Sequence, residues 1–402
     1  MRYTIFRPYA KCADMMYSRL AAALLSVVLV LGSSSVVLGD SSIAPVSPLP
    51  EFSADARSDV QEFLLSGIES AIGLMMADSA FEGFNFRSVM ELGSRLSAYR
   101  FDYGLLEAIE DIHWYPIMSG GEIVMIASMH GDPNSPTVII SNEFASPLRD
   151  FLAFNDSAFA LLFMDDNLYA VTEDGQVLLR SYAALSDTYS VAAFANFNFR
   201  SANMQLAVVD AIIEVVPNDY IALSRSNISH FIDVPIVGQG RTNLCWAAVA
   251  ASLIRHNGGP SHTPAYLASR LGVRPEDGAG MRQTVNAITE IWRVVPEYHA
   301  HFHAPRLNYV SRMITERNTP VPIGFMPPSG GLGHMVLFRS YSRNVGAGHH
   351  LMSFMDSALW NGDGGIGMTL NTSPTAPITI THGGRVLNAI SHAHTSPNPT
   401  GW

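Results

Sequence analysis

The sequence predicts an α+β protein with two main domains, and three observations support this expectation. Hydrophobic residues make up 48% of the 402 residues, which is enough to bury a sizeable core. Short apolar runs separated by turn residues dominate the region 80–225 and are typical of strands. From residue 226 onward, apolar runs with helical spacing come first and strand-like runs follow. We therefore expect a separate α+β domain at 80–225 and a second domain at 226–402.

The first 39 residues are typical of an export signal. Four basic side chains within 1–19 precede an apolar run at 20–31, and the small residues up to Gly39 suit a signal peptidase. An uncleaved membrane anchor is the alternative, but the many Ala, Gly and Ser residues at 21–38 favour cleavage. The expected product is secreted or extracellular (periplasmic in a Gram-negative host), and it meets a membrane only through this signal.

Charge and cysteine content narrow the class of protein further. The net charge is −11, charged residues make up only 15% of the chain, and no basic stripe is present, so a nucleic-acid partner is not expected. Cleavage after Gly39 would remove Cys12 and leave Cys245 as the single cysteine of the mature chain. A lone cysteine in an exported protein is either an intermolecular link or a reactive thiol.

Residues 40–79 are expected to form a Ser- and Pro-rich linker followed by a helix over 55–76, and a further helix is expected over 86–112. Turn residues then separate five expected strands, of which the last two form a hairpin: Glu122–Met129, Thr137–Asn142, Ala158–Met164, Asn167–Thr172 and Gln176–Tyr182. No catalytic constellation is evident in this domain. His113 and His130 are interpreted as surface or core-edge residues.

In the second domain, a Gly- and Pro-rich loop leads into a helix that begins at Cys245. Apolar residues follow at the spacing of an amphipathic helix, and Asn243 is its expected N-cap. A thiol at this point lies at the positive end of the helix dipole, which favours the nucleophilic thiolate. Free backbone amides there, together with the side chain of Gln239, can bind an oxyanion. A small buried core cysteine is the competing interpretation of Cys245.

Further helices are expected at Thr263–Leu271, Met281–Trp292 and Leu307–Arg317, and short strands at Tyr298–His303, Pro320–Phe325, Ile378–Ile380 and Val386–Ile390. The alternation of His299, His301 and His303 places three imidazoles on one side of a strand, where they can bind a metal. No carboxylate or cysteine with ligand spacing completes such a site, so neither a metal nor another cofactor is expected. His382, His392 and His394 in the C-terminal tail are interpreted as facing solvent.

The stretch 331–356 contains a histidine and an acid that favour the interpretation of Cys245 as a reactive thiol. His334 opens an apolar strand, a turn follows near Val345, and a return strand ends at Asp356. In a hairpin centred on Val345, His334 and Asp356 are opposite each other, and their side chains lie on the same face. The carboxylate can then orient the imidazole and stabilise its charged form. A structural histidine beside an acid is the alternative, but it explains neither the lone cysteine nor the loop before it.

These residues carry a resemblance to a known family. Gln239-x5-Cys245-Trp246, Gly333-His334 before an apolar strand, and Asp356 at the end of the next strand resemble papain-like cysteine peptidases. The compact spacing is more similar to bacterial members, which include the bacteriocin-leader-peptidase-like and staphopain-like groups. The resemblance covers about residues 233–360. The Cys-Gly-Ser-Cys-Trp signature of the plant enzymes is absent, and Asp stands where Asn is more familiar.

The resemblance implies a two-lobed catalytic domain, with a helical lobe carrying Cys245 and an antiparallel β lobe carrying His334. It implies Cys245 as the nucleophile, His334 as general base and acid, Asp356 as its orienting partner and Gln239 as an oxyanion donor. The substrate would be a protein or peptide. A zymogen is also implied, with 80–225 as an inhibitory pro-region released by cleavage within 216–232; a permanent accessory domain is the alternative. Transglutaminase- or deamidase-like acyl transfer, or a catalytically silent binding protein, remain as further alternatives.

Overall fold

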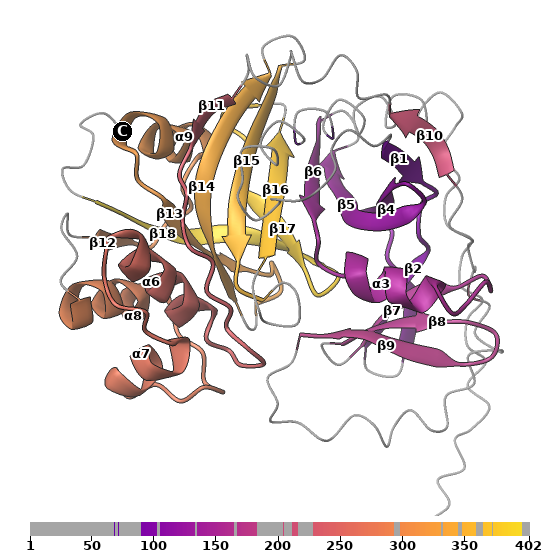
Figure 1. The fold of residues 1–402 in the computed structure, drawn as a ribbon, viewed down its shortest axis with the longest axis horizontal. Helices are drawn as coiled ribbons and strands as arrows, with labels where there is room; N and C mark the ends of the chain where they lie inside the picture. The colour runs from indigo at the N-terminus through magenta and orange to yellow at the C-terminus, as the bar shows by residue number, and fades with distance from the viewer. Residues whose placement is uncertain are drawn as a thin grey trace, which may run out of the picture. The chain divides into compact units, whose positions relative to one another are not determined.

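The computed structural model describes residues 68, 71, 90–102, 105–132, 135–164, 167–182, 204, 211–215, 228–292, 298–330, 333–344, 348–358, 365–371 and 373–395. Within them the chain has a mixed α+β fold in which strands predominate and pair mostly antiparallel (Figure 1). The predicted α+β class is confirmed. The expected leader and linker lie outside the described residues, as does the expected helix at 55–76 apart from Ile68 and Ala71, which are helical and buried.

Most strands belong to one large sheet. Its strands are β1 (Met90–Gly93), β4 (Ile112–Ser119), β5 (Glu122–Asp132), β6 (Ser135–Ser141), β10 (Ala211–Val215), β11 (Ile228–Phe231), β12 (Tyr298–His301), β13 (Val321–Met326), β14 (His334–Asn344), β15 (His349–Asp356), β16 (Gly365–Asn371), β17 (Thr379–His382) and β18 (Arg385–Thr395). They follow the order β10-β1-β4-β5-β6-β16-β15-β14-β13-β18-β12, with β11 paired to β14 and β17 paired to β18. Strands from both halves of the sequence therefore share one hydrogen-bonded ladder.

A smaller sheet is formed by the N-terminal half alone. It contains β2 (Ala98–Asp102), β3 (Leu105–Ala108), β7 (Ala160–Met164), β8 (Asn167–Val171) and β9 (Gln176–Ser181), in the order β3-β2-β7-β8-β9. The predicted hairpin of β8 and β9 is confirmed, and β2 with β7 is a parallel pair. Helix α3 (Ala145–Leu152) packs against β5 and β9, so it lies between the two sheets.

The helix expected over 86–112 is wrong, because the chain there forms β1, β2 and β3. The apolar residues that fit a helical period belong to separate short strands. Met90 and Leu92 are spaced by two, and the backbone of Leu96 pairs with that of Trp114. Short apolar stretches do not distinguish a helix from strands by period alone, and pairing with β4 and β7 decides the outcome here.

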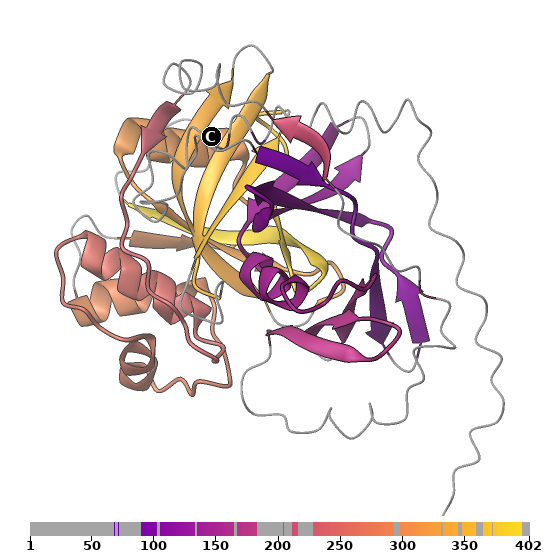
Figure 2. The ribbon, with the colours of Figure 1, turned by 45° about the vertical axis from the view of Figure 1, so that its right-hand side comes forward.

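The helices of the second half agree with the sequence prediction. They are α6 (Cys245–His256), α7 (Pro264–Arg270), α8 (Met281–Asn286), the π-helical turn η4 (Ala287–Trp292) that continues α8, and α9 (Leu307–Arg317). Thr263 caps α7 by accepting a hydrogen bond from the amide of Tyr266 at 3.2 Å. Figures 1 and 2 show α6, α7 and α8 gathered together on the side of β14 away from β6. Helix α6 contacts α7, α8 and β14.

The predicted separation of the N-terminal domain is not confirmed. Strand β6 pairs with β16 through four residue pairs, from Gly367–Ser141 to Leu370–Val138. A single buried cluster unites Met125 and Ile140 of the N-terminal half with Leu351 and Leu370 of the C-terminal half. Residues 216–227, which contain most of the expected cleavage segment, lie outside the described part of the chain.

Candidate active site

Cys245 is the first residue of α6, as the sequence predicts. The expected N-cap is wrong: Leu244 occupies that position, and no described side chain caps the helix. Asn243 instead donates from Nδ2 to the carbonyl oxygen of Glu276 at 2.9 Å, which ties the loop before α6 to the loop before α8. The positive end of the helix dipole therefore lies at the thiol without a capping side chain to offset it.

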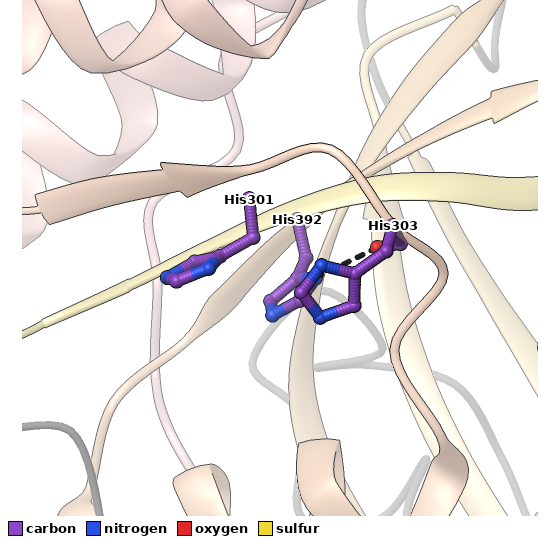
Figure 3. A group of neighbouring side chains, drawn as sticks. All are labelled: His301, His303 and His392. Atoms are coloured by element: carbon purple, nitrogen blue, oxygen red, sulfur yellow. Dashed lines mark hydrogen bonds between the residues drawn. The ribbon is translucent and has the colours of Figure 1, made fainter.

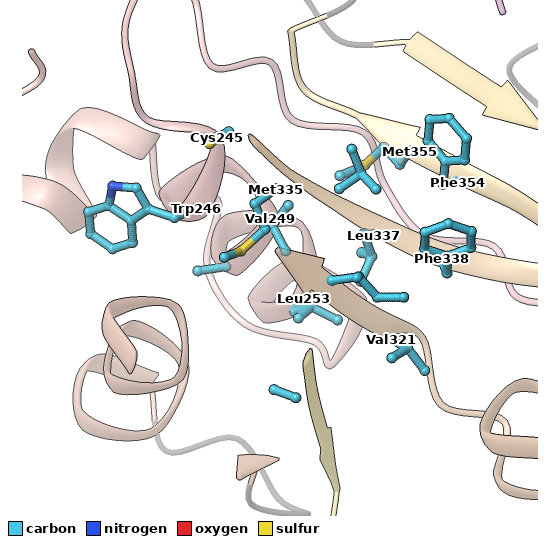
Figure 4. Close-up of a cluster of buried hydrophobic side chains, with 14 of the residues drawn as sticks. Cys245, Trp246, Val249, Leu253, Val321, Met335, Leu337, Phe338, Phe354 and Met355 are labelled. Carbon is cyan, nitrogen blue, oxygen red and sulfur yellow. The ribbon is translucent and has the colours of Figure 1, made fainter. Parts of the chain in front are cut away.

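Helix α6 is encased rather than amphipathic. All residues from Cys245 to Ile254 are buried, because α7, α8 and β14 cover its different faces. Figure 4 shows Cys245 on the first turn, with Val249 beside Met335 of β14 and Trp246 directed to the other side of the helix. Cys245 keeps 8% of its surface exposed. The packing thus holds the thiol in one position while leaving it an opening to solvent.

His334 begins β14 and Asp356 ends β15, and the hairpin brings the two side chains together. The expected register was off by two residues: Val336, not His334, is opposite Asp356, because the turn lies between Asn344 and His349 and a bulge interrupts the ladder. A shift of two residues keeps a side chain on the same face of a sheet. Nε2 of His334 accordingly donates to Oδ1 of Asp356 at 2.7 Å, so the expected contact is present along the diagonal.

The two groups form a buried charged pair. Burial by itself would lower the pKa of His334, but the charge and hydrogen bond of Asp356 and a hydrogen bond with Cys245 raise that pKa to about 10. For Asp356, burial would raise the pKa, but the charge and hydrogen bond of His334 and the amide of Ala358, which donates at 2.8 Å, bring it down to about 2. An imidazolium and a carboxylate are therefore the stable forms at neutral pH.

The side chain of Cys245 lies next to this pair, because its influence contributes to the raised pKa of His334. Nε2 of His334 is committed to Asp356, so Nδ1 is the ring nitrogen that does not contact the carboxylate. The fold thus brings together three residues that are far apart in the sequence.

Gln239 lies in the wall of the same cleft as Cys245 and His334. Its Oε1 accepts a hydrogen bond from the hydroxyl of Ser357 at 2.9 Å, and its Nε2 donates to the carbonyl oxygen of Thr242 at 2.7 Å. A carboxamide nitrogen carries two hydrogens, so one remains for a ligand after the bond to Thr242. The structure therefore brings all four predicted site residues to one place.

His382 belongs to this site, although the sequence interpretation placed it in solvent. Its ring stacks on that of His334, with centroids 4.2 Å apart and 13° between the planes. Burial, reinforced by the charge of His334, lowers the pKa of His382 well below its usual value. A neutral ring can lie flat against the imidazolium and hold its orientation without adding a like charge. His382 lies at this site because it ends β17, which pairs with β18 beside the cleft.

The N-terminal half also contributes to the site, which its sequence did not indicate. Tyr182 follows β9, lines the cleft, and meets the ring of His382 edge-on at 5.0 Å. Its hydroxyl donates to Oε1 of Glu143 at 2.6 Å. Buried Arg180 donates to the backbone carbonyls of Glu143 and Ala358. The bond from Arg180 to Ala358 ties the N-terminal half to the residues that follow Asp356.

The cleft has a volume of about 540 Å³. Its walls combine apolar side chains such as Met281 and Phe325 with charged ones of opposite sign, Asp277 and Arg385. This volume lies within the usual range of small-ligand sites. The glycine-rich loop before α8 and strand β18 both contribute residues to its walls, so the cleft is shaped by elements distant from Cys245 in the sequence.

Two groups of described residues have the composition of metal sites, namely His334 with Asp356 and His382, and His301 with His303 and His392. In the first group the His334–Asp356 hydrogen bond already occupies one nitrogen. His392 of the second group was expected to face solvent but is fully buried. The neighbouring His394, which was also expected to face solvent, is only 2% exposed. That expectation is wrong because β18 lies between β12 and β13 rather than at the edge of the sheet.

No protein-family model matches the chain, and no curated protein is significantly similar to it. Among the described residues, no helix has both the length and the apolar character needed to span a membrane.

Proposed function

We propose that the protein is a cysteine peptidase that hydrolyses peptide bonds through Cys245, His334 and Asp356. The observation that carries this proposal is the placement of Cys245 and His334 together in the wall of one cleft, with His334 hydrogen-bonded to the buried Asp356. A structural histidine–acid pair accounts for the hydrogen bond between His334 and Asp356. It does not account for a cysteine that begins a helix and lines the same cleft as the imidazole.

Each group has a definite part in the proposed reaction. The thiolate of Cys245 attacks the amide carbonyl carbon, while the side chain of Gln239 and the backbone amide of Cys245 stabilise the oxyanion. His334 gives its proton to the leaving amine and then takes one from the water that hydrolyses the thioester. Asp356 holds the ring orientation and stabilises the charged form. The reaction as proposed needs no cofactor.

The arrangement around the cleft supports a papain-like architecture. Helices α6, α7 and α8 surround the cysteine, while β13, β14 and β15 carry or flank the histidine and the acid. The cleft opens where these two groups of elements meet. We propose that they are the helical and β lobes of such a peptidase.

We further propose that residues 80–225 remain part of the active protein. Two features support this over a released pro-region. The pairing of β6 with β16 continues the sheet that carries Asp356, and Arg180 binds the carbonyl oxygen of Ala358. Release of the N-terminal half would leave an open strand edge and the buried Leu370 exposed, and both carry a large free-energy cost.

The test is a peptidase assay on the full chain with a fluorogenic peptide mixture, beside Cys245→Ala, His334→Gln and the control His262→Gln. The control removes an imidazole that stacks on Tyr266 of α7 and is not part of the cleft wall. The two site variants should lose roughly a thousandfold or more in kcat/KM, because the members act as a unit. A thiol-directed covalent inhibitor should add one adduct, on Cys245.

Hydrolysis that persists in Cys245→Ala would refute the proposal. Incorporation of an added primary amine, in place of free acid, would assign the same three residues to acyl transfer. An inert chain whose cysteine takes no label would identify a silent binding protein on a peptidase-like scaffold.

A further inference from the structure

A cluster of histidines lies at the edge of the large sheet, away from the three residues above. Strands β12 and β18 pair so that His301 is opposite His392, and His303 follows two residues after His301 (Figure 3). The side-chain nitrogens of these three residues include one from each that lie within 4.8 Å of one another. Nitrogens bound to one tetrahedral ion lie about 3.4 Å apart, so the three rings are already close to the spacing that a metal requires.

The hydrogen bonds of the cluster leave the correct nitrogen for a metal. Nδ1 of His392 donates to the carbonyl oxygen of His303 at 3.1 Å, as Figure 3 shows, which leaves the lone pair on Nε2. This Nε2 is buried, and none of the described residues offers it a hydrogen bond. A buried acceptor without a partner is costly, and a metal would satisfy it. A backbone carbonyl that fixes the tautomer of a histidine is the usual outer support of a metal ligand.

The rings of the cluster pack against one another. His301 and His392 stack with centroids 5.0 Å apart and 17° between the planes. His394 also stacks on His301, with centroids 4.4 Å apart and 13° between the planes, which limits the movement of that ring. Neutral imidazoles are the ligands that zinc, copper and nickel accept.

We propose that His301, His303 and His392 bind a divalent transition metal of the zinc class, which clamps the edge strand β12 to β18. Three imidazoles fill three positions, and the exposure of His303 leaves the fourth to water. Strand β12 is the last strand of the sheet, and β18 carries Arg385 and Ile390 into the wall of the cleft. The metal would therefore stabilise the strand that shapes that wall. The proposal is independent of the peptidase activity.

The test is a calorimetric titration of ZnCl2 into the untagged, chelator-stripped full chain carrying Cys245→Ala, so that no thiolate competes for the metal. His303→Gln and His301→Gln should each weaken the tightest Zn²⁺ site at least tenfold. His299→Gln is the matched control, because His299 lies on the same strand, is exposed and is outside the ligand group. It should leave the affinity within about twofold. Zn²⁺ should raise the melting temperature of the parent and of His299→Gln more than that of His303→Gln.

His303 is exposed, so His303→Gln should fold like the parent and tests the proposal without disturbing the core. Co²⁺ in place of Zn²⁺ should give the intense visible absorption of a four-coordinate site, and His303→Gln should lose it. Equal Zn²⁺ affinity in the parent, His301→Gln and His303→Gln would overturn the proposal. So would a loss of affinity in His299→Gln as large as that in His303→Gln.

Discussion

At the scale of single residues, the central feature is the charged state of His334. Its imidazole is hydrogen-bonded to Asp356, stacks on the ring of His382 and lines the same cleft as Cys245. The carboxylate outweighs the effect of burial, so the ring keeps a proton well above the pH at which an exposed histidine loses it. A protonated imidazole is ready to stabilise a thiolate and to supply a proton to a leaving amine.

Replacement of the Asp356 carboxylate should show how much its negative charge contributes to the proposed reaction. Asp356→Asn keeps the shape of the side chain but removes the charge that holds the proton on His334, so kcat/KM should fall by roughly 10²–10⁴. The pH dependence of inhibitor labelling at Cys245 should shift as well. Asp150→Asn is the control, because Asp150 is an exposed residue of α3, and its ion pair with Arg149 lies on the surface. An Asp356→Asn chain with parental kcat/KM would contradict the assigned role.

The stability of the protein should depend on pH through His334. The pKa of His334 is about 10 in the folded chain and about 6.5 when unfolded, so the folded state binds more protons between these values. Stability from this group is fully present below pH 6.5 and is lost as the pH rises toward about 10. Urea midpoints of a Cys245→Ser chain, which is unable to digest itself, should fall over this range. The fall should be smaller in Cys245→Ser/His334→Gln, and equal slopes would contradict the prediction.

At the scale of elements, two contacts position the reactive groups. Helix α6 is covered on several faces, which holds Cys245, and the pairing of β13 with β14 places His334 opposite Phe325. Gly333 lies just before His334, close to the backbone of Phe325 in β13. A Cβ added there would come within 2.6 Å of the carbonyl oxygen of Phe325. The start of β14 therefore depends on the absence of a side chain at this position.

Gly333→Ala should push the beginning of β14 away from β13 and move His334 relative to Cys245. We expect kcat to fall by roughly tenfold or more with a smaller change in KM, because misplacement of a reacting group acts on the chemical step. Leu370→Ala controls for lost stability, since this buried residue of β16 should cost about 2–5 kcal/mol on truncation. Its folded fraction should keep the parental kcat. Equal losses of kcat in both variants would refute a specific role for Gly333.

At the scale of the whole molecule, the two halves of the sequence share one sheet. Strand β6 covers the edge of β16, and β16 in turn pairs with β15, which ends at Asp356. The cluster beneath this seam draws buried apolar residues from both halves. A chain cut between the halves should therefore stay together, because separation exposes both the strand edge and this cluster to water.

Limited proteolysis within 216–227 provides the measurement. The two fragments should elute together in size-exclusion chromatography and separate only in denaturant, and the nicked complex should keep the peptidase activity of the intact chain. Spontaneous release of the N-terminal fragment, with a gain of activity, would contradict this prediction and support the zymogen. As a control, Ile140→Asp should weaken the association, because Ile140 is buried at the seam and pairs with Met368.

The sequence by itself determined the local features of this protein. A loop running into apolar residues with helical spacing identified Cys245 as a helix start, and the hairpin around residue 345 placed His334 and Asp356 on one face. The inference about His334 and Asp356 was correct although the predicted register was wrong by two residues, because side chains alternate along a strand with a period of two. Both inferences depend only on residues that are close together in the sequence, so the spacing of apolar residues was enough to make them.

Only the tertiary structure decided which distant segments meet. Three contacts could not be predicted from the local sequence, because they join residues that are far apart in the chain. They are the pairing of β6 with β16, the stacking of His382 on His334, and the packing of buried His392 beside His301. The strands at 90–108 were missed for the same reason, since pairing with β4 and β7 outweighed a helix-like spacing. Partners in a sheet are chosen by the packing of the complete chain, and that choice assembled both the cleft and the histidine cluster.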